Sequence, residues 1–137
     1  MDALETQNMF VNNFINKTKR DRTLFELNSS RKREAFLIKL NHQSLNYIEE
    51  RKLILIPKKE SNEYLFIREN LKVKGTDLCL ILSNYNHIDN KIMPFKEAFD
   101  EIYGNGLASL LVFEKAEKIY LQTEQEQGAS DKYIGKI

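Results

Sequence analysis

The sequence is poor in residues that stabilise or punctuate many small proteins: among 137 residues it has one cysteine, two prolines, five glycines and no tryptophan. The single Cys79 cannot close an intrachain disulfide, which argues against the disulfide-stabilised secreted domains. A chain of this length buries roughly two-thirds of its unfolded surface, so it needs no structural metal. His42, Cys79 and His87 lack the paired spacing of a zinc site, and we expect neither a metal nor another cofactor.

Long apolar runs are also missing. The longest are 53–56 and 78–82, whereas a membrane-spanning helix needs about 20 apolar residues. The amino terminus begins with Met1 and Asp2, which is acidic where a secretory signal is basic, and polar residues follow where its apolar stretch should run. We therefore expect a cytoplasmic protein with no membrane association.

No single sign of charge dominates, because 21 Lys and Arg balance 20 Asp and Glu to a formal net charge of +1. This balance argues against a histone-like, strongly supercharged or disordered chain. The distribution is nevertheless uneven: residues 1–59 hold 12 basic and 7 acidic residues, whereas residues 60–137 hold 9 and 13. The sequence thus predicts a basic first part and an acidic second part.

Residues 1–52 have the apolar spacing of helices. The pattern over 3–19 predicts an amphipathic first helix. After a connector, Ser29 and Ser30 are suited to cap a second helix that runs to about Glu50, because a serine hydroxyl accepts a hydrogen bond from a free amide of the first turn. We expect residues 1–52 to form a helical part with two helices.

Residues 53–127 predict mainly strands. Short apolar runs occur at 53–56, 64–68, 78–82, 107–113 and 119–123, and 71–74 could extend the second of them. Before the fourth run, Pro94 is suited to begin a short helix that ends at Gly104. Residues 128–137 then read as a polar tail.

The order of these elements predicts one α+β domain over residues 1–137. It has two N-terminal helices followed by a mainly antiparallel sheet of four to five strands with one short inserted helix, and its helices lie on one side of the sheet. Gly104 and Gly106 follow a helix instead of linking a strand to a helix, which excludes a Rossmann or P-loop motif. We recognise no family in these motifs.

The densest basic stretch flanks the connection between the two predicted helices. Seven basic residues fall within it: Lys17, Lys19, Arg20, Arg22, Arg31, Lys32 and Arg33. Lys and Arg displace the counterions of nucleic acid, and two basic clusters beside a helix-to-helix connection could follow its backbone. The structural alternative is that 17–22 complements the carboxyl end of a helix dipole while 31–33 forms a solvated face. A nucleic-acid-binding regulator is our second hypothesis.

The acidic residues of the second part favour another kind of partner. Glu97 and Glu101 lie on the short helix, and Glu124 and Glu126 share one face of the last predicted strand. Opposite charge accelerates encounter with a basic protein and rejects wrong partners. Our leading hypothesis is therefore a small protein-binding module of the inhibitor, immunity or adaptor type. The terminal hairpin could also pair two copies, so a homodimer is an alternative.

Catalysis is the third hypothesis, and it depends on one loop. His87 and Asp89 follow the apolar run 78–82, near where sheet-based sites open, and a carboxylate there could orient the imidazole. Their spacing matches no nucleophile motif, and Cys79 within the run is better explained as an inert buried thiol. An enzyme would need a concave pocket beside this loop.

Overall fold

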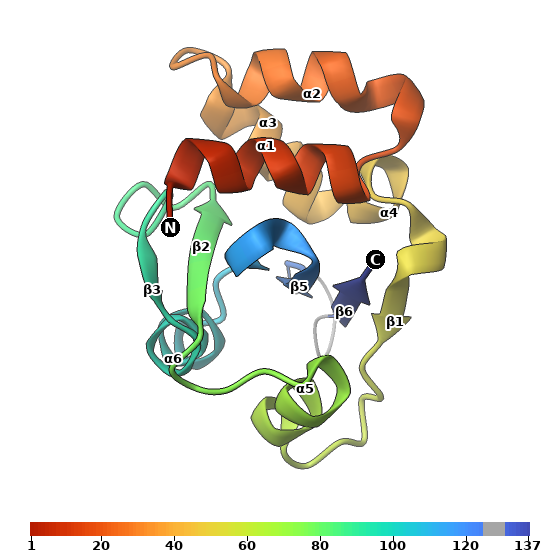
Figure 1. Cartoon of the computed structure of the whole chain (residues 1–137), viewed down its shortest axis with the longest axis vertical. Coiled ribbons are helices and arrows are strands. Elements are labelled where there is room, and N and C mark those ends of the chain that lie inside the picture. The colour runs from red at the N-terminus through yellow and green to blue at the C-terminus, as the bar shows by residue number, and fades with distance from the viewer. Residues whose placement is uncertain (125–130) are drawn as a thin grey trace.

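Residues 1–124 and 131–137, which the computed structural model describes, form six α-helices, three short 3₁₀ helices and six strands (Figure 1). The α-helices are α1 (Ala3–Phe14), α2 (Arg20–Leu27), α3 (Arg33–His42), α4 (Ser44–Tyr47), α5 (Glu63–Leu71) and α6 (Phe95–Asn105). The 3₁₀ helices are η1 (Lys17–Lys19), η2 (Glu50–Lys52) and η3 (Glu114–Ala116). The strands are β1 (Leu53–Leu55), β2 (Leu78–Ser83), β3 (Ile92–Pro94), β4 (Ser109–Phe113), β5 (Lys118–Gln122) and β6 (Lys132–Lys136).

These strands form one sheet in the order β1-β6-β5-β4-β2-β3, and every pairing is antiparallel. The predicted α+β class and antiparallel sheet are confirmed, with six strands in place of four to five. The predicted hairpin of 107–113 and 119–123 is the pair β4 and β5, with η3 as its turn. The predicted helix between Pro94 and Gly104 is α6.

The first face of the sheet is covered by the amino-terminal helices. Phe10 and Phe14 of α1 and Leu40 of α3 pack in one buried cluster with Leu80 of β2 and Val112 of β4. The first of these helices is capped as its sequence allows, because the Asp2 side chain accepts a hydrogen bond from the Glu5 amide at 2.8 Å.

The opposite face is covered by α5 and α6, so the helices lie on both sides of the sheet and the prediction of one side is wrong. Ile67 of α5 and Phe95 and Phe99 of α6 pack with Ile81 of β2 and Tyr120 of β5. The central strands require this second layer of helices, since β4 is buried at every position and β2 and β5 at all but the first. Strands that are apolar on consecutive positions need cover on both faces.

The helical part contains four α-helices instead of the predicted two. The first ends at Phe14, not Lys19, and the expected connector is helical, because Thr23 and Leu27 share a buried face of α2. Neither Ser29 nor Ser30 caps α3, whose N-cap residue is Lys32 without a side-chain hydrogen bond. The main-chain carbonyl of Ser29 instead accepts the Arg33 amide at 2.9 Å.

The run 64–68 is a helix and not the predicted strand. The Asn62 side chain accepts a hydrogen bond from the Leu65 amide at 3.0 Å and so caps α5. Ile67 and Leu71 lie four residues apart and bury one helical face. The helix ends at Leu71, and the C-cap residue Lys72 adopts a left-handed conformation with φ of 56°. An apolar and aromatic run this short fits both periodicities, and burial against the sheet selected the helix.

The predicted polar tail includes a strand. Its described part, 131–137, contains β6, which lies between β1 and β5 and buries Ile134 completely. Close packing also surrounds Gly135, because an added Cβ atom would lie 2.8 Å from Ile119 Cγ1 and 3.0 Å from Leu53 Cδ2. We did not predict this strand because its short sequence mixes charged, apolar and small residues, and its composition therefore resembles that of a polar tail.

We expect Gly135→Ala to lower the free energy of unfolding by about 1–3 kcal/mol, because the new methyl group would overpack β5 and β1. The matched control is Gly104→Ala in α6, where an added Cβ meets nothing within 4 Å. It should raise stability by about 0.5–1 kcal/mol through helix propensity. Urea denaturation of both variants measures the difference, and equal stabilities would contradict the packing of β6.

Candidate functional site

The two predicted basic clusters lie at opposite ends of α2. Lys17, Lys19 and Arg20 stand at its amino end, whereas 31–33 follow its carboxyl end. A helix of this length spans about 12 Å at a rise of 1.5 Å per residue. Between them, exposed Arg22 donates to Glu26 at 3.1 Å along the helix. The predicted nucleic-acid surface is therefore divided between two separate places.

At the amino end of α2, the basic residues surround one carboxylate. Glu49 accepts Arg20 at 3.2 Å and Arg51 at 2.8 Å, and it lies 3.6 Å from the ammonium of Lys52. The Lys19 ammonium contacts the main-chain carbonyl of Asn46. We call this group of Lys17, Lys19, Arg20, Glu49, Glu50, Arg51 and Lys52 the Glu49 corner.

A depression of about 400 Å³ opens at the Glu49 corner and is lined by Asn16, Lys17, Arg20, Glu49, Glu50 and Arg51. Sequence reasoning missed that Arg51 and Lys52 join the first basic cluster. Two backbone contacts bring them together: a bridge between Ile15 and Ile48, and a hydrogen bond from the Asn16 amide to the Tyr47 carbonyl at 2.8 Å.

At the other end of α2, Arg33 is bound to Asp89, the carboxylate that the enzyme hypothesis needs. The guanidinium donates from Nε to Oδ2 at 2.7 Å and from Nη2 to Oδ1 at 3.0 Å. Asp89 Oδ1 also accepts the Ser83 amide at 3.0 Å, and Arg33 donates to the Leu27 carbonyl at 3.0 Å. This bidentate pair fastens α3 to the turn after β2.

The neighbours of this pair remain exposed. Arg31 is exposed, and the Lys32 ammonium stands 5.0 Å from the centroid of the Phe25 ring. His87 is exposed in the same turn as Asp89, with its ring edge-on to Tyr85 at 6.4 Å between centroids. Both Asp89 oxygens are thus used by Arg33 and Ser83, and they are positioned for the fold instead of for the imidazole.

Cys79 offers no nucleophile to the turn of His87 and Asp89, because it lies near the start of β2 and the turn follows its end. It is fully buried in β2, and burial raises the pKa of its thiol, with the nearby Asp77 carboxylate adding to the effect. A thiol held in its protonated form is neither a nucleophile nor a metal ligand. The interpretation of Cys79 as a buried apolar residue agrees with this environment.

The predicted acidic site residues also lie in separate places, on α6 and after β5. Glu97 is exposed and Glu101 half-buried one turn further along α6, where Asp100 pairs with Lys96 at 3.0 Å. Exposed Glu124 follows β5, and its carboxylate contacts Nε2 of His42 at the end of α3. Glu126 lies outside the described residues. The structure therefore joins Glu124 to the amino-terminal helices and not to α6.

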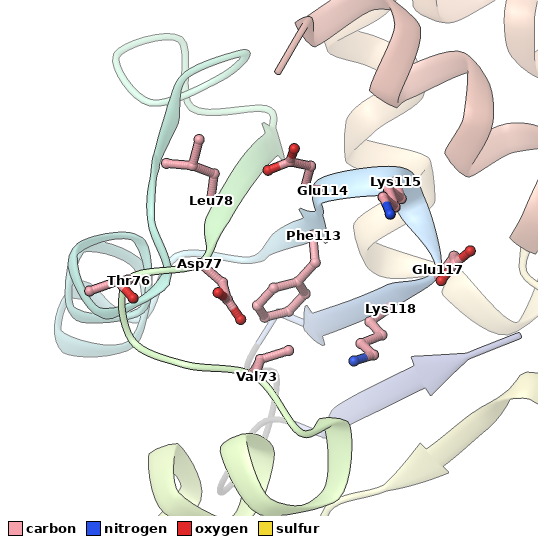
Figure 2. A pocket seen from close by; sticks show the side chains of 9 residues that line it. All are labelled: Val73, Thr76, Asp77, Leu78, Phe113, Glu114, Lys115, Glu117 and Lys118. Carbon is pink, nitrogen blue, oxygen red and sulfur yellow. The ribbon is translucent and has the colours of Figure 1, made fainter.

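A second depression, of about 320 Å³, lies where β2 begins and β4 ends, and Figure 2 shows the side chains that line it. The Phe113 ring stands in its middle, between Asp77 on one side and Val73 and Lys118 on the other (Figure 2). The Asp77 carboxylate already accepts the Lys74 amide at 2.8 Å. With acids and lysines both on its rim, this depression favours no single ligand charge.

Within residues 1–124 and 131–137, no three His, Cys, Asp or Glu residues gather as a metal ion would require. The helices in these residues are each too short or too polar to cross a membrane. No protein-family model, curated protein or solved structure matches the chain. Its function must therefore be argued from its own residues.

We expect Asp89→Ala to lower the free energy of unfolding by about 2–4 kcal/mol, because it leaves the largely buried Arg33 guanidinium and the Ser83 amide without their acceptor. His87→Ala, in the same turn, should change stability by less than about 0.5 kcal/mol. Chemical denaturation of both variants tests this. Similar stabilities would show that Asp89 is free for another role.

We also expect the stability of the protein at low pH to depend on Glu49. The hydrogen bond from Arg51 holds the pKa of the Glu49 carboxyl below its ordinary value of 4.5, against the opposing effect of desolvation, with Lys52 assisting. A lowered pKa means stability that is present above 4.5 and lost as the pH falls through the folded-state pKa. Glu49→Gln should flatten the loss of stability in that range. An unchanged slope in acid denaturation would contradict the charge arrangement of the Glu49 corner.

Proposed function

We propose that this protein is a small protein-binding module, of the inhibitor, immunity or adaptor type, that recognises a basic partner through α6. The observation that carries the proposal is the orientation of that helix. Phe95, Ala98, Phe99 and Ile102 are buried against the sheet, which turns Glu97 and its neighbours outward. We call Glu97, Asp100 and Glu101 the α6 acidic face.

The α6 acidic face suits recognition because its support is rigid. A helix whose apolar side is packed into the core presents its outer carboxylates at fixed spacing, so little conformational freedom is lost when a partner binds. Lys96 neutralises only Asp100 within this face, at 3.0 Å. A row of cationic side chains on a partner would complement the remaining charge.

The alternatives draw less support from the same contacts. For catalysis, Asp89 is used by Arg33 and Ser83. For nucleic acid, the two basic clusters lie at opposite ends of α2, and Arg33 of the second cluster is bound to Asp89, so the seven basic residues do not form one surface along a phosphate backbone. Glu124 would contribute to a protein interface only if its contact with His42 opened. The predicted homodimer through the terminal hairpin is wrong, because β4 and β5 are each paired on both sides within the sheet; a homodimer through another surface would be detected by sedimentation.

We expect the double substitution Glu97→Lys and Glu101→Lys to abolish capture of a basic protein from an extract of the native host at low salt. The matched control is Glu5→Lys with Glu34→Lys, two exposed acids on α1 and α3 that cover the opposite face. Quantitative mass spectrometry of the retained proteins is the readout. Capture of no basic protein, or equal capture by the α6 double variant, would refute the proposal.

A further inference from the structure

The two edges of the sheet are protected differently. At one edge, β3 contains Pro94, which has no amide hydrogen to offer to a further strand. At the other edge, β1 consists of Leu53, Ile54 and Leu55, and among the described residues it pairs with β6 alone. Edge strands attract further strands unless charge, proline or a covering element prevents it. The β1 edge carries neither a proline nor a charge within its three residues.

The register of β1 determines which of its backbone groups face outward. Ile54 lies opposite Ile134, and two residues later the Ile56 amide donates to the Lys132 carbonyl at 2.8 Å. In an antiparallel pair, hydrogen-bonded and non-bonded positions alternate. Ile54 and Ile56 therefore bond to β6, and the N–H and C=O of Leu55 point away from the sheet.

Leu53 also has a backbone carbonyl that points away from the sheet. Its amide donates to the Glu50 carbonyl and closes η2, whereas its carbonyl points in the same direction as the N–H and C=O of Leu55. An incoming strand would thus find one complete donor and acceptor pair and one extra acceptor. The side chains fit such a partner too, because Ile54 is 44% exposed and Leu55 48% exposed on opposite faces of the edge.

The charge around this edge is concentrated at its amino end. The Glu49 corner ends at Lys52, immediately before β1, and holds five basic residues and two acidic ones. At the other end, Lys58 pairs with Asp131 at 3.1 Å, and exposed Lys59 is followed by Glu60. A segment that bound beside the start of β1 would therefore lie next to this surplus of positive charge.

We propose that β1 is a docking edge that adds an extended, acidic segment of a partner protein to the sheet. The segment runs antiparallel to β1, like every other pairing, and exchanges two hydrogen bonds with Leu55. This direction places its carboxyl-terminal residues beside the start of β1, where Lys17 and Arg51 line the depression of the Glu49 corner. Acidic residues are therefore needed at that end.

A second copy of the chain fits the edge less well. Antiparallel pairing of two β1 strands would place Arg51 and Lys52 of one copy beside Lys58 and Lys59 of the other, and like charges facing each other across strands are destabilising. Apolar Ile54 and Leu55 alone would favour such a dimer. The basic flanks therefore act against self-association and in favour of an acidic partner.

The probe is a short peptide with alternating valine and threonine followed by three glutamates at its carboxyl end, titrated into the full chain at low salt. Its control has the same residues with the glutamates at the amino end and should bind at least tenfold less tightly. Arg51→Glu with Lys17→Glu should weaken binding of the first peptide at least tenfold. Leu55→Pro should do the same, because the amide it removes makes no bond to β6.

Amide exchange tests the edge without any variant. The Leu55 amide should exchange rapidly in the free protein and become protected at saturating peptide, with the Ile54 amide, bonded to β6, as the internal reference. Unchanged Leu55 exchange, equal binding of both peptides, or a free protein that is a dimer with a protected Leu55 amide would each overturn the proposal. Glu97→Lys with Glu101→Lys should bind the peptide normally, so this test is independent of the α6 acidic face.

Discussion

The burial of the central strands on both faces is the constraint on which the rest of the structure depends. Because β2, β4 and β5 are apolar on nearly every position, one layer of helices cannot shield them. The four amino-terminal helices cover one face, and α5 with α6 covers the other. What remains accessible to a partner is the outer side of these helices and the two edges of the sheet.

Ion pairs then fix the places where the helical layer meets the sheet. The Arg33 and Asp89 pair ties α3 to the turn after β2, and Glu49 gathers side chains from α2 and η2 next to β1. The Arg33–Asp89 and Arg20–Glu49 pairs each join segments that are distant in sequence. The two basic clusters thus differ in setting: one is anchored into the fold through Arg33, whereas the other retains a surplus of charge at the surface beside an open strand.

The sequence predicted elements whose signals were local. Pro94 and Gly104 delimited α6, and the consecutive apolar residues of 78–82 marked a buried strand. The strand predicted for Tyr64 to Arg68 was wrong. Its aromatic and β-branched residues favour strands, but the Asn62 cap and contact with the sheet stabilise a helix. The candidate site depended still more on distant contacts. Arg51 lies near Lys17, and Asp89 near Arg33, only because of the tertiary fold, so local composition could not predict either contact.

The position of β6 has a consequence for the order in which the sheet is assembled. Of the six strands in the described part of the chain, β1 comes first and β6 last, yet β1 joins the sheet there through β6 alone, with Leu53 opposite Gly135. During synthesis, β1 must wait until every other strand has been made before its partner exists. Such long-range closure is slow compared with the pairing of β4 and β5, which are neighbours in the chain. The nascent chain therefore carries the apolar β1 strand unpaired from the synthesis of Leu53 until that of Lys136.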